Sequence, residues 1–340
     1  MGNPWAYDFS AIGQRSAPLL IIHGSDVDAF SKQQGGFKVG GNSDIYQLIP
    51  ETMRFDQLNL SKQFLKAEGR PDPARYPVVL NLVTDPDQHP RTLLRVQKVL
   101  RGYKGRVINR PDALLRTTRD QVAKRLTGIP CLRVPKLIRL RNPKPGAASA
   151  ASQRAGQSFP LIVRLAGTHT GKIVGIVKTP DELDAAAVGT GEFLVIEFVD
   201  FRSDDGLYRK YRFWSFGGRT IFRHLIISDQ WNVHVSERMR LMLDRPDLME
   251  EEQRLLTRPD GAFPGGVHAT FDAVKTRMGL DFFGMDFALD ADGRIILFEA
   301  NATMNFFPLE PHLKFSYLGK LRGPAQDAFT AMLGFEGGSE

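Results

Sequence analysis

Residues 279–305, GLDFFGMDFALDADGRIILFEANATMN, are the part of this 340-residue chain that decides the expected fold. Two apolar runs flank Asp292-Gly293, a dipeptide suited to a two-residue type I′ hairpin turn. With that turn, Asp286 lies directly opposite Glu299, and Asn301 shares the face of Glu299 because strand side chains alternate. The stretch predicts a β-hairpin that carries two carboxylates and an amide on one face.

The two facing carboxylates call for a cation between them, because like charges opposite each other across a ladder are destabilising. Two carboxylates and an amide oxygen suit Mg²⁺ or Mn²⁺ better than zinc. The alternative is a solvated polar face without an ion. We favour the ion because apolar residues of the same strands predict a core on the opposite side, namely Phe283, Met285, Phe287 and Phe298.

The order of Asp286, a short turn and Phe298-Glu299-Ala300-Asn301 resembles the metal-binding end of the ATP-grasp ligases, of the glutathione synthetase or ribosomal-protein-modifying type. The resemblance implies an α/β (α+β) ATP-grasp-like fold, with an ATP site between two α+β subdomains and a small N-terminal α/β lobe. It also implies that Asp286, Glu299 and Asn301 hold Mg²⁺ or Mn²⁺ against the phosphates of ATP.

The composition predicts a globular chain of two or three subdomains, with 42% hydrophobic and 24% charged residues. The apolar runs are too short to span a bilayer and no signal pattern opens the sequence, so we expect a cytoplasmic protein without a membrane partner. Its single cysteine, Cys131, excludes an internal disulfide. The net charge of +7 suits an anionic ligand such as a nucleotide, and no nucleic-acid-binding motif is present. The sequence is compatible with a homo-oligomer.

The first hundred residues indicate a small α/β unit. The runs 18–22 and 77–83 predict buried parallel strands, and 91–101 has leucines and valines at helical spacing. The glycine-rich stretch 31–44 is expected to be a surface loop, because its glycines lack the spacing of a phosphate loop.

The middle of the chain begins with a short strand at 105–108 and a helix from Thr118 to Leu126, where Gln121 completes a capping box. The TGIPCLRVPKL segment that follows resembles the family's entry into its central domain. Residues 142–157, rich in Pro, Ala, Gly and Ser, indicate a linker or a flexible loop. We expect an N-terminal lobe over 1–108, ATP-grasp subdomains over 109–192 and 193–325, and a C-terminal tail over 326–340.

A strand from Phe159 ends in Arg164, before a loop of glycines and hydroxyl residues that can turn backbone N–H groups toward phosphates. In the ATP-grasp pattern this strand ends in a lysine that contacts the α- and β-phosphates. Arg164 is therefore expected to bind phosphate, and Lys172 in the loop to share that role. The alternative is an exposed hairpin turn. His169 is assigned no role.

The run EFLVIEFV, 192–199, resembles the hinge that binds adenine in the family. The resemblance implies that backbone atoms of Phe198 and Val199 contact the adenine edge and that Glu197 takes the acidic hinge position. Three aspartates follow that could bind the ribose hydroxyls, and of these Asp205 is retained as a predicted site residue: Asp200, Asp204 and Asp205.

A basic strand pair follows, joined by a Gly217-Gly218 turn. Alternation places Lys210, Arg212 and Trp214 on one face of the first strand, and the second contains Arg223. The resemblance implies that Arg212 and Arg223 act on the γ-phosphate and on an acyl-phosphate intermediate. Lys210 stands where many members have an acidic residue. A solvated strand face is the alternative for each basic residue.

Together these features predict an ATP- and Mg²⁺-dependent ligase that activates a small-molecule carboxylate as an acyl phosphate, which an amine then attacks to form an amide. One alternative is a polyol or sugar kinase on the same scaffold, which needs a base that the sequence does not identify. Another is a non-catalytic nucleotide-binding module, favoured by the departures at Arg164 and Lys210. Metal-dependent ADP release with a carboxylate and an amine, with a polyol, or not at all separates the three.

Overall fold

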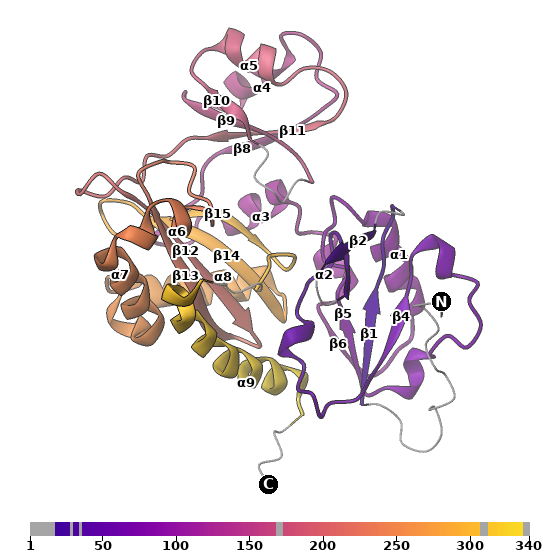
Figure 1. The fold of residues 1–340 in the computed structure, drawn as a ribbon. Coiled ribbons are helices and arrows are strands. Elements are labelled where there is room, and N and C mark those ends of the chain that lie inside the picture. The colour runs from indigo at the N-terminus through magenta and orange to yellow at the C-terminus, as the bar shows by residue number, and fades with distance from the viewer. Residues whose placement is uncertain (1–17, 28–29, 34–35, 168–172, 307–311, 336–340) are drawn as a thin grey trace.

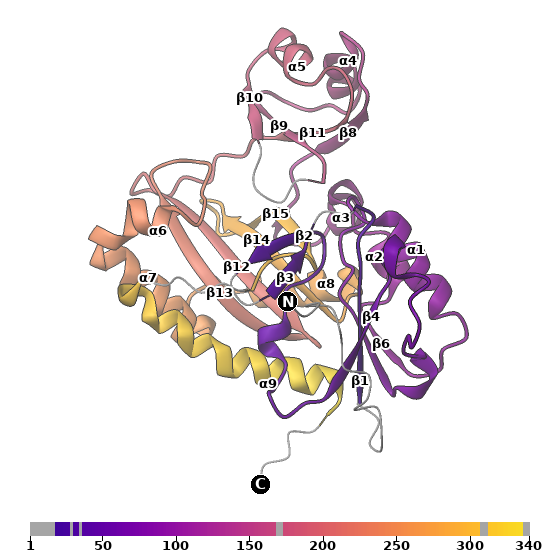
Figure 2. The same cartoon turned by 45° about the vertical axis from the view of Figure 1, so that its right-hand side comes forward.

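The computed structural model describes residues 18–27, 30–33, 36–167, 173–306 and 312–335. Figure 1 shows three units: an N-terminal lobe in indigo and violet, a small unit that holds β8 to β11, and a central unit in orange and yellow. Figure 2 shows that the β8–β11 unit stands above the central sheet in the turned view as well. No helix in the described part of the chain is both long and apolar enough to cross a membrane.

The N-terminal lobe is built on a parallel sheet of order β4-β1-β5-β6. Its central strand β1, Leu19–His23, is flanked by β4, Phe55–Asn59, and by β5, Val78–Asn81, which pairs in turn with β6, Arg106–Ile108. Leu19, Leu20, Ile21 and Ile22 are fully buried, as apolar runs in a parallel sheet require. The predicted buried strands are confirmed, as is the helix, α1, Pro90–Val99.

The glycine-rich stretch contains a small hairpin and not only a loop, so that prediction is wrong. β2, Phe30–Gln33, and β3, Gly36–Val39, pair antiparallel with Phe30 opposite Val39. Strands of four residues lie within the usual range of strand lengths in globular proteins. The lobe also contains short 3₁₀ turns at Tyr46–Leu48 (η2), Lys62–Phe64 (η3) and Pro73–Arg75 (η4).

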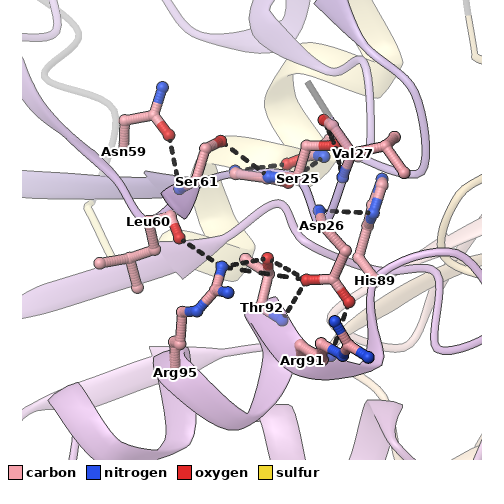
Figure 3. Close-up of polar contacts among 12 residues, drawn as sticks. Ser25, Asp26, Val27, Asn59, Leu60, Ser61, His89, Arg91, Thr92 and Arg95 are labelled. Carbon is pink, nitrogen blue, oxygen red and sulfur yellow. Dashed lines mark hydrogen bonds and ion pairs between the residues drawn. The ribbon is translucent and has the colours of Figure 1, made fainter. Parts of the chain in front are cut away.

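The loop after β1 is fixed to the start of α1 by Asp26, as Figure 3 shows. The Asp26 carboxylate accepts hydrogen bonds from the backbone N–H of Arg91 at 2.8 Å and of Thr92 at 2.7 Å, and from Thr92 Oγ1 at 2.6 Å. The Asp26 N–H donates to His89 Nδ1 at 3.1 Å. A carboxylate at this position satisfies free amides of the first helical turn and complements the helix dipole, so this cluster stabilises the lobe.

Two helices lead from the lobe to the rest of the chain: α2, Pro111–Leu114, and α3, Arg119–Leu126. The helix predicted from Thr118 is confirmed, but its capping box is not formed, because the Thr118 side chain makes no capping hydrogen bond. Asp120 in the first turn carries the negative charge at this end and binds Arg139 at 2.8 Å.

The β8–β11 unit is a four-stranded antiparallel sheet of order β10-β9-β11-β8. Its strands are Leu137–Arg141 (β8), Leu161–Leu165 (β9), Ile173–Val177 (β10) and Glu192–Glu197 (β11). The predicted linker 142–157 is wrong, because it contains α4, Ala147–Arg154, whose alanines favour a helix. With α5, Pro180–Ala186, this helix covers a core that includes Leu161, Val163 and Leu183.

The central unit is a five-stranded sheet of order β13-β12-β14-β15-β7. Its strands are Tyr208–Phe216 (β12), Arg219–Ser228 (β13), Phe282–Leu289 (β14), Ile295–Asn301 (β15) and Leu132–Arg133 (β7). The helical segments around it are Glu237–Arg240 (α6), Met242–Asp244 (η5), Pro246–Thr257 (α7), Pro259–Gly261 (η6), Val267–Met278 (α8), Leu313–Leu321 (η7) and Arg322–Leu333 (α9).

Alternation along β12 separates a core face from a polar face. On the core face the ring of Phe213 packs against those of Phe271 and Phe283, with centroids 4.9 and 6.1 Å apart. The predicted Gly217-Gly218 turn is confirmed, and both glycines have the positive φ that a type I′ turn requires, 55° and 88°.

Two elements of the structure lie close to predicted domain boundaries. β11 begins at Glu192 and belongs as a whole to the β8–β11 sheet, and residues 326–333 form part of α9. The domain boundaries stay a prediction.

Candidate active site

The hairpin of β14 and β15 pairs Asp286 with Glu299, as predicted, although its turn differs from the expected one. The Asp290 N–H donates to the Arg294 carbonyl at 2.9 Å, so three residues form the loop and not two. Gly293 closes it with a φ of 77°, as in a type I turn followed by a left-handed residue. The type I′ prediction is wrong.

Strands β13 and β15 each contain a β-bulge. Each bulge shifts the strand pairing by one residue and turns an additional side chain toward the same cavity. In β15 the pairing changes beside Asp286, which leaves Phe298 as the additional residue. In β13 it changes beside Arg212, which leaves Arg223 as the additional residue. Because of the bulges, neighbouring residues that strict alternation would separate both line the cavity, Phe298 with Glu299 and Arg223 with His224.

The cavity has a volume of about 400 Å³ and is lined by residues of the β8–β11 unit and of the central sheet. This volume lies in the range of pockets that hold ligands the size of a drug or cofactor. One group of lining residues is apolar: Ile162, Ile196, Phe198, Val199, Trp231, Ile296 and Phe298. The other group is charged: Arg119, Arg164, Glu197, Lys210, Arg212, Arg223, Arg238, Asp286 and Glu299.

Asp286 is buried in the charged part of the cavity and is held by two cations. Arg212 binds it through Nε and through Nη2, the latter 2.7 Å from Oδ2, and Lys210 Nζ lies 3.8 Å from Oδ2. Burial would raise the pKa of Asp286, but Arg212 and then Lys210 lower it below its ordinary value overall. Asp286 is therefore ionised at neutral pH. Burial also lowers the pKa of Lys210, whose ammonium donates to the Val233 carbonyl at 2.7 Å.

Glu299 binds a separate arginine, Arg119, which also donates to the Phe298 carbonyl at 2.9 Å. Asn301 lines a smaller neighbouring cavity of about 60 Å³ together with Glu299, and its Oδ1 accepts from the Thr303 N–H at 2.9 Å. Within the described part of the chain no three His, Cys, Asp or Glu side chains come together as metal ligands. The predicted metal set thus consists of two facing carboxylates, each neutralised by a guanidinium, and a nearby amide.

Of the residues predicted to bind phosphate groups, three lie in the described part of the chain. Arg164 lines both cavities from β9, and burial lowers its pKa. Arg212 and Arg223 line the larger cavity beside it. Lys172 lies outside the described residues, as does His169.

The predicted adenine hinge lies at the apolar part of the cavity. Phe198 contacts Trp231 with ring centroids 5.6 Å apart, and its own N–H donates to the Pro160 carbonyl at 3.0 Å. Glu197 lines the cavity, and its carboxylate accepts from the N–H of Lys136 at 3.2 Å and of Ser158 at 3.1 Å. Glu197 thereby fixes the hinge to Lys136, which directly precedes β8, and to Ser158.

The predicted ribose ligand is in a different place. Asp205 does not line the cavity, and Arg209 binds it with Nη2 2.8 Å from Oδ2. Arg209 also binds Glu251 of α7 at 2.7 Å. The cluster therefore lies on the side of β12 that faces α7, away from the cavity. Asp200 and Asp204 do not line the cavity either.

The cavity residues that were not predicted include three with ionisable side chains and one large aromatic residue: Arg119, His224, Arg238 and Trp231. His224 lines the cavity because of the bulge in β13, and no local sequence pattern predicts that bulge. Arg119 and Arg238 are single basic residues in helices, and only the pairing of those helices with the sheet distinguishes them from surface arginines. An HVSERMR run, 234–240, was the one available signal for Arg238, as a basic segment next to an aromatic residue.

Comparison with solved structures identifies the fold. The chain is similar to VanG D-Ala:D-Ser ligase from Enterococcus faecalis, with a TM-score of 0.52 and 12% identity over 93% of this chain and 98% of that chain. It is also similar to D-alanyl-alanine synthetase A from Vibrio cholerae, with a TM-score of 0.53 and 14% identity over 91% and 98% of the two chains. The ATP-grasp ligase PsnB, in complex with a precursor peptide and AMPPNP, gives a TM-score of 0.50 and 14% identity over 93% and 97%. No family model and no curated protein matches the sequence. The predicted ATP-grasp fold is confirmed.

Proposed function

We propose that this chain, with its ATP-grasp fold, is an ATP-dependent ligase that joins a carboxylate to an amine. One observation carries the proposal: a single cavity between two sheets combines an apolar part with a dense group of cations around two facing carboxylates. A nucleotide has the same two parts, a base and an anionic phosphate chain. The identities of the carboxylate and the amine are left to experiment.

The apolar part suits the adenine base. Phe198 and Trp231 offer aromatic surface on one side, and Phe298 lines the cavity from β15. Backbone atoms of the hinge at Phe198 and Val199 are proposed to hydrogen-bond the base edge, with Glu197 holding the hinge in place. The N–H of Phe198 is already used by Pro160, so its carbonyl is the atom left for this role.

The charged part suits phosphoryl transfer, in which positioning and charge neutralisation do most of the catalysis. Arg164, with Lys172, is proposed to bind the phosphates, while Arg212 and Arg223 stabilise the transferred group. The γ-phosphoryl group passes to the substrate carboxylate, which gives an acyl phosphate and ADP. The amine then attacks the acyl carbon and releases inorganic phosphate.

The donor set offers a magnesium ion two facing carboxylates and an amide oxygen, but Arg119 and Arg212 now neutralise the carboxylates, so the ion would bind there only as these arginines turn to phosphate oxygens. Asp286, Glu299 and Asn301 would hold Mg²⁺, or Mn²⁺, with the hard oxygen ligands that such ions prefer. Bound there, the ion would neutralise phosphate charge during transfer. Arg119 and Arg212 sit beside that charge and are placed to bind phosphate oxygens themselves.

ADP formation from pools of carboxylates and amines, with Mg²⁺ or with excess chelator, tests the proposal. We expect sustained ADP release over many turnovers only when carboxylate, amine and Mg²⁺ are all present. Glu299→Gln should keep the fold by thermal unfolding and lose most turnover, whereas Glu51→Gln, at an exposed position of the N-terminal lobe, should behave as wild type. ADP release with a polyol instead would indicate the kinase, and full turnover by Glu299→Gln would reject the metal assignment.

A further inference from the structure

The net positive charge of the chain is concentrated in one short segment of the N-terminal lobe. Residues 91–110 contain seven lysines and arginines and no aspartate or glutamate. Of the 45 lysines and arginines in the chain, the 38 outside this segment equal the 38 aspartates and glutamates, so the segment alone accounts for the net charge of +7. Most of α1 and all of β6 belong to it. This part of the molecule therefore attracts an anionic partner most strongly.

Helix α1 presents its charges on the side opposite its core contacts. The residues of α1 that are buried lie on one side of the helix: Thr92, Leu93 and Val96. Arg91, Leu94 and Lys98 are exposed and lie three or four residues apart, so they follow the other side. The N–H of the exposed Arg101 donates to the Lys98 carbonyl at 3.3 Å, which continues that side by one further step. We call Arg91, Leu94, Lys98 and Arg101 the α1 stripe.

The α1 stripe is not neutralised within the described part of the chain. The one ion pair of α1 there joins Arg95 to Asp26, with Nη1 3.9 Å from Oδ1, and Figure 3 shows this contact at the start of the helix. An exposed arginine of α6 gives the contrast, because Arg240 binds both Asp229 and Glu237. The positive charge of the stripe therefore faces solvent and is open to a partner.

Helix stability does not explain the arginines of α1. Arg91 lies in the first turn, where the helix dipole is positive and favours acidic residues. Arg95 adds a like charge at the i,i+4 spacing from Arg91, which is also unfavourable. Asp26 offsets part of this charge at the helix start through Arg95 and the backbone N–H of Arg91. Contact with an anionic surface outside the chain gives these arginines a role that the helix itself does not.

Leu94 indicates the kind of partner. It is 54% exposed and lies between Arg91 and Lys98 on the α1 stripe. An apolar centre inside a charged rim that includes arginine is the usual anatomy of a protein–protein interface. A phosphate backbone offers Leu94 no apolar contact, and the stripe has no aromatic side chain on which bases stack. A single leucine also buries too little apolar area to hold a membrane surface.

We propose that the α1 stripe is the docking surface for an acidic protein partner. The partner places carboxylates against Arg91, Lys98 and Arg101 and covers Leu94 with an apolar side chain. Steps of three and four residues bring side chains to neighbouring positions on one side of a helix, so carboxylates at the same spacing on a partner helix match the three cations. Complementary charge of this kind speeds association and orients the partner, and it is screened by salt. The docking surface does not depend on the ligase reaction.

Fluorescence anisotropy of the full chain with two labelled peptides tests the proposal, one of Glu-Glu-Leu repeats and one of Glu-Glu-Ser repeats. We expect the leucine peptide to bind more tightly, and Leu94→Ser to abolish that preference. Arg91→Glu/Lys98→Glu/Arg101→Glu should weaken binding of the leucine peptide at least about tenfold. A control that reverses three exposed cations on α7, just after it and on α9 has the same net charge and should stay within about twofold of wild type. This control is Arg254→Glu/Arg258→Glu/Arg322→Glu.

Thermal unfolding should show that all these variants fold like wild type, since every altered side chain is exposed. Equal weakening in the two triple variants would mean that the peptide follows only net charge, and it would overturn the docking surface. Equal affinity of wild type for the leucine and serine peptides would overturn it too. A labelled oligouridylate that binds more tightly than the leucine peptide, and no longer binds the α1 triple variant, would assign the stripe to nucleic acid and reject the protein partner.

Discussion

Arg212 with Asp286 and Arg238 with Glu252 are two buried ion pairs of the central unit, with similar chemistry and different surroundings. Asp286 lines the cavity, has Lys210 as a second cation and faces another carboxylate across the ladder. Glu252 is fully buried and saturated by its donors. An ion pair alone therefore does not indicate function. A carboxylate that lines a cavity with more than one cation can exchange partners, whereas a saturated one only supports its neighbour.

The largest expected effect comes from breaking the supporting pair. Glu252→Gln should lower the free energy of unfolding by about 3–5 kcal/mol, because Arg238 stays buried without a counter-charge. Denaturant unfolding of the two proteins measures this difference. The double variant Arg238→Met/Glu252→Gln should recover part of the loss, since no charge is left uncompensated. A single variant as stable as wild type would show that Glu252 does not hold Arg238.

The next effect is on catalysis, because Arg212 belongs to the pair that lines the cavity, where Lys210 remains as a second cation for Asp286. Arg212→Met should lower kcat by a factor on the order of hundreds and weaken ATP binding much less, because the charge it stabilises develops during transfer. Steady-state kinetics on a substrate found in the ADP screen, with ATP affinity measured separately, gives the two numbers. An unaltered kcat would mean that Arg212 only neutralises Asp286.

Tyr317 tests the supporting pair alone, because its hydroxyl donates to Glu252 and Tyr317 does not line the cavity. Tyr317→Phe removes the hydroxyl that donates to Glu252 at 2.6 Å, and a hydrogen bond to a charged group contributes about 1.5–3 kcal/mol. We expect a loss of stability of that size with unchanged kcat. A drop in kcat without loss of stability would place Tyr317 in the catalytic machinery, which the geometry does not indicate.

The sequence was informative where one local rule decides the structure. The turn at Gly217-Gly218 and the buried runs of β1 and β5 follow from residue type and periodicity alone. The pairing of Asp286 with Glu299 was predicted from a wrong turn, and it holds because a longer loop and the bulge at Phe298 offset each other. The longer loop and the bulge each shift the strand pairing by one residue, and the two shifts cancel. The alternation of apolar and polar residues in the sequence therefore does not reveal either of them.

The sequence was uninformative where contacts between distant segments decide. Asp205 and Asp286 are both acidic residues near basic strands, but only Asp286 lines the cavity, because Arg209 draws Asp205 to Glu251 on α7. Arg119 reaches Glu299 from a helix 180 residues earlier in the chain. Such contacts depend on how the units pack, and no local spacing contains that information.

The smallest expected effect is at the exposed end of α6, where Arg240 repeats the chemistry of Arg238 in water. Arg240 Nε lies 2.9 Å from Glu237 Oε2, and this hydrogen bond, with that from Ser228, lowers the pKa of Glu237 below its ordinary value of 4.5 despite partial burial. A lowered folded-state pKa stabilises the protein above pH 4.5, and this contribution disappears as the pH falls through the folded-state pKa. Arg240→Met should therefore destabilise slightly at pH 7, and the difference from wild type should shrink below pH 4.5 and in high salt. Thermal unfolding of both proteins from pH 7 to pH 3 measures this, with Arg254→Met on α7 as the control. A difference that stays constant over that range would mean that Arg240 acts through packing of its side chain and not through the charge of Glu237.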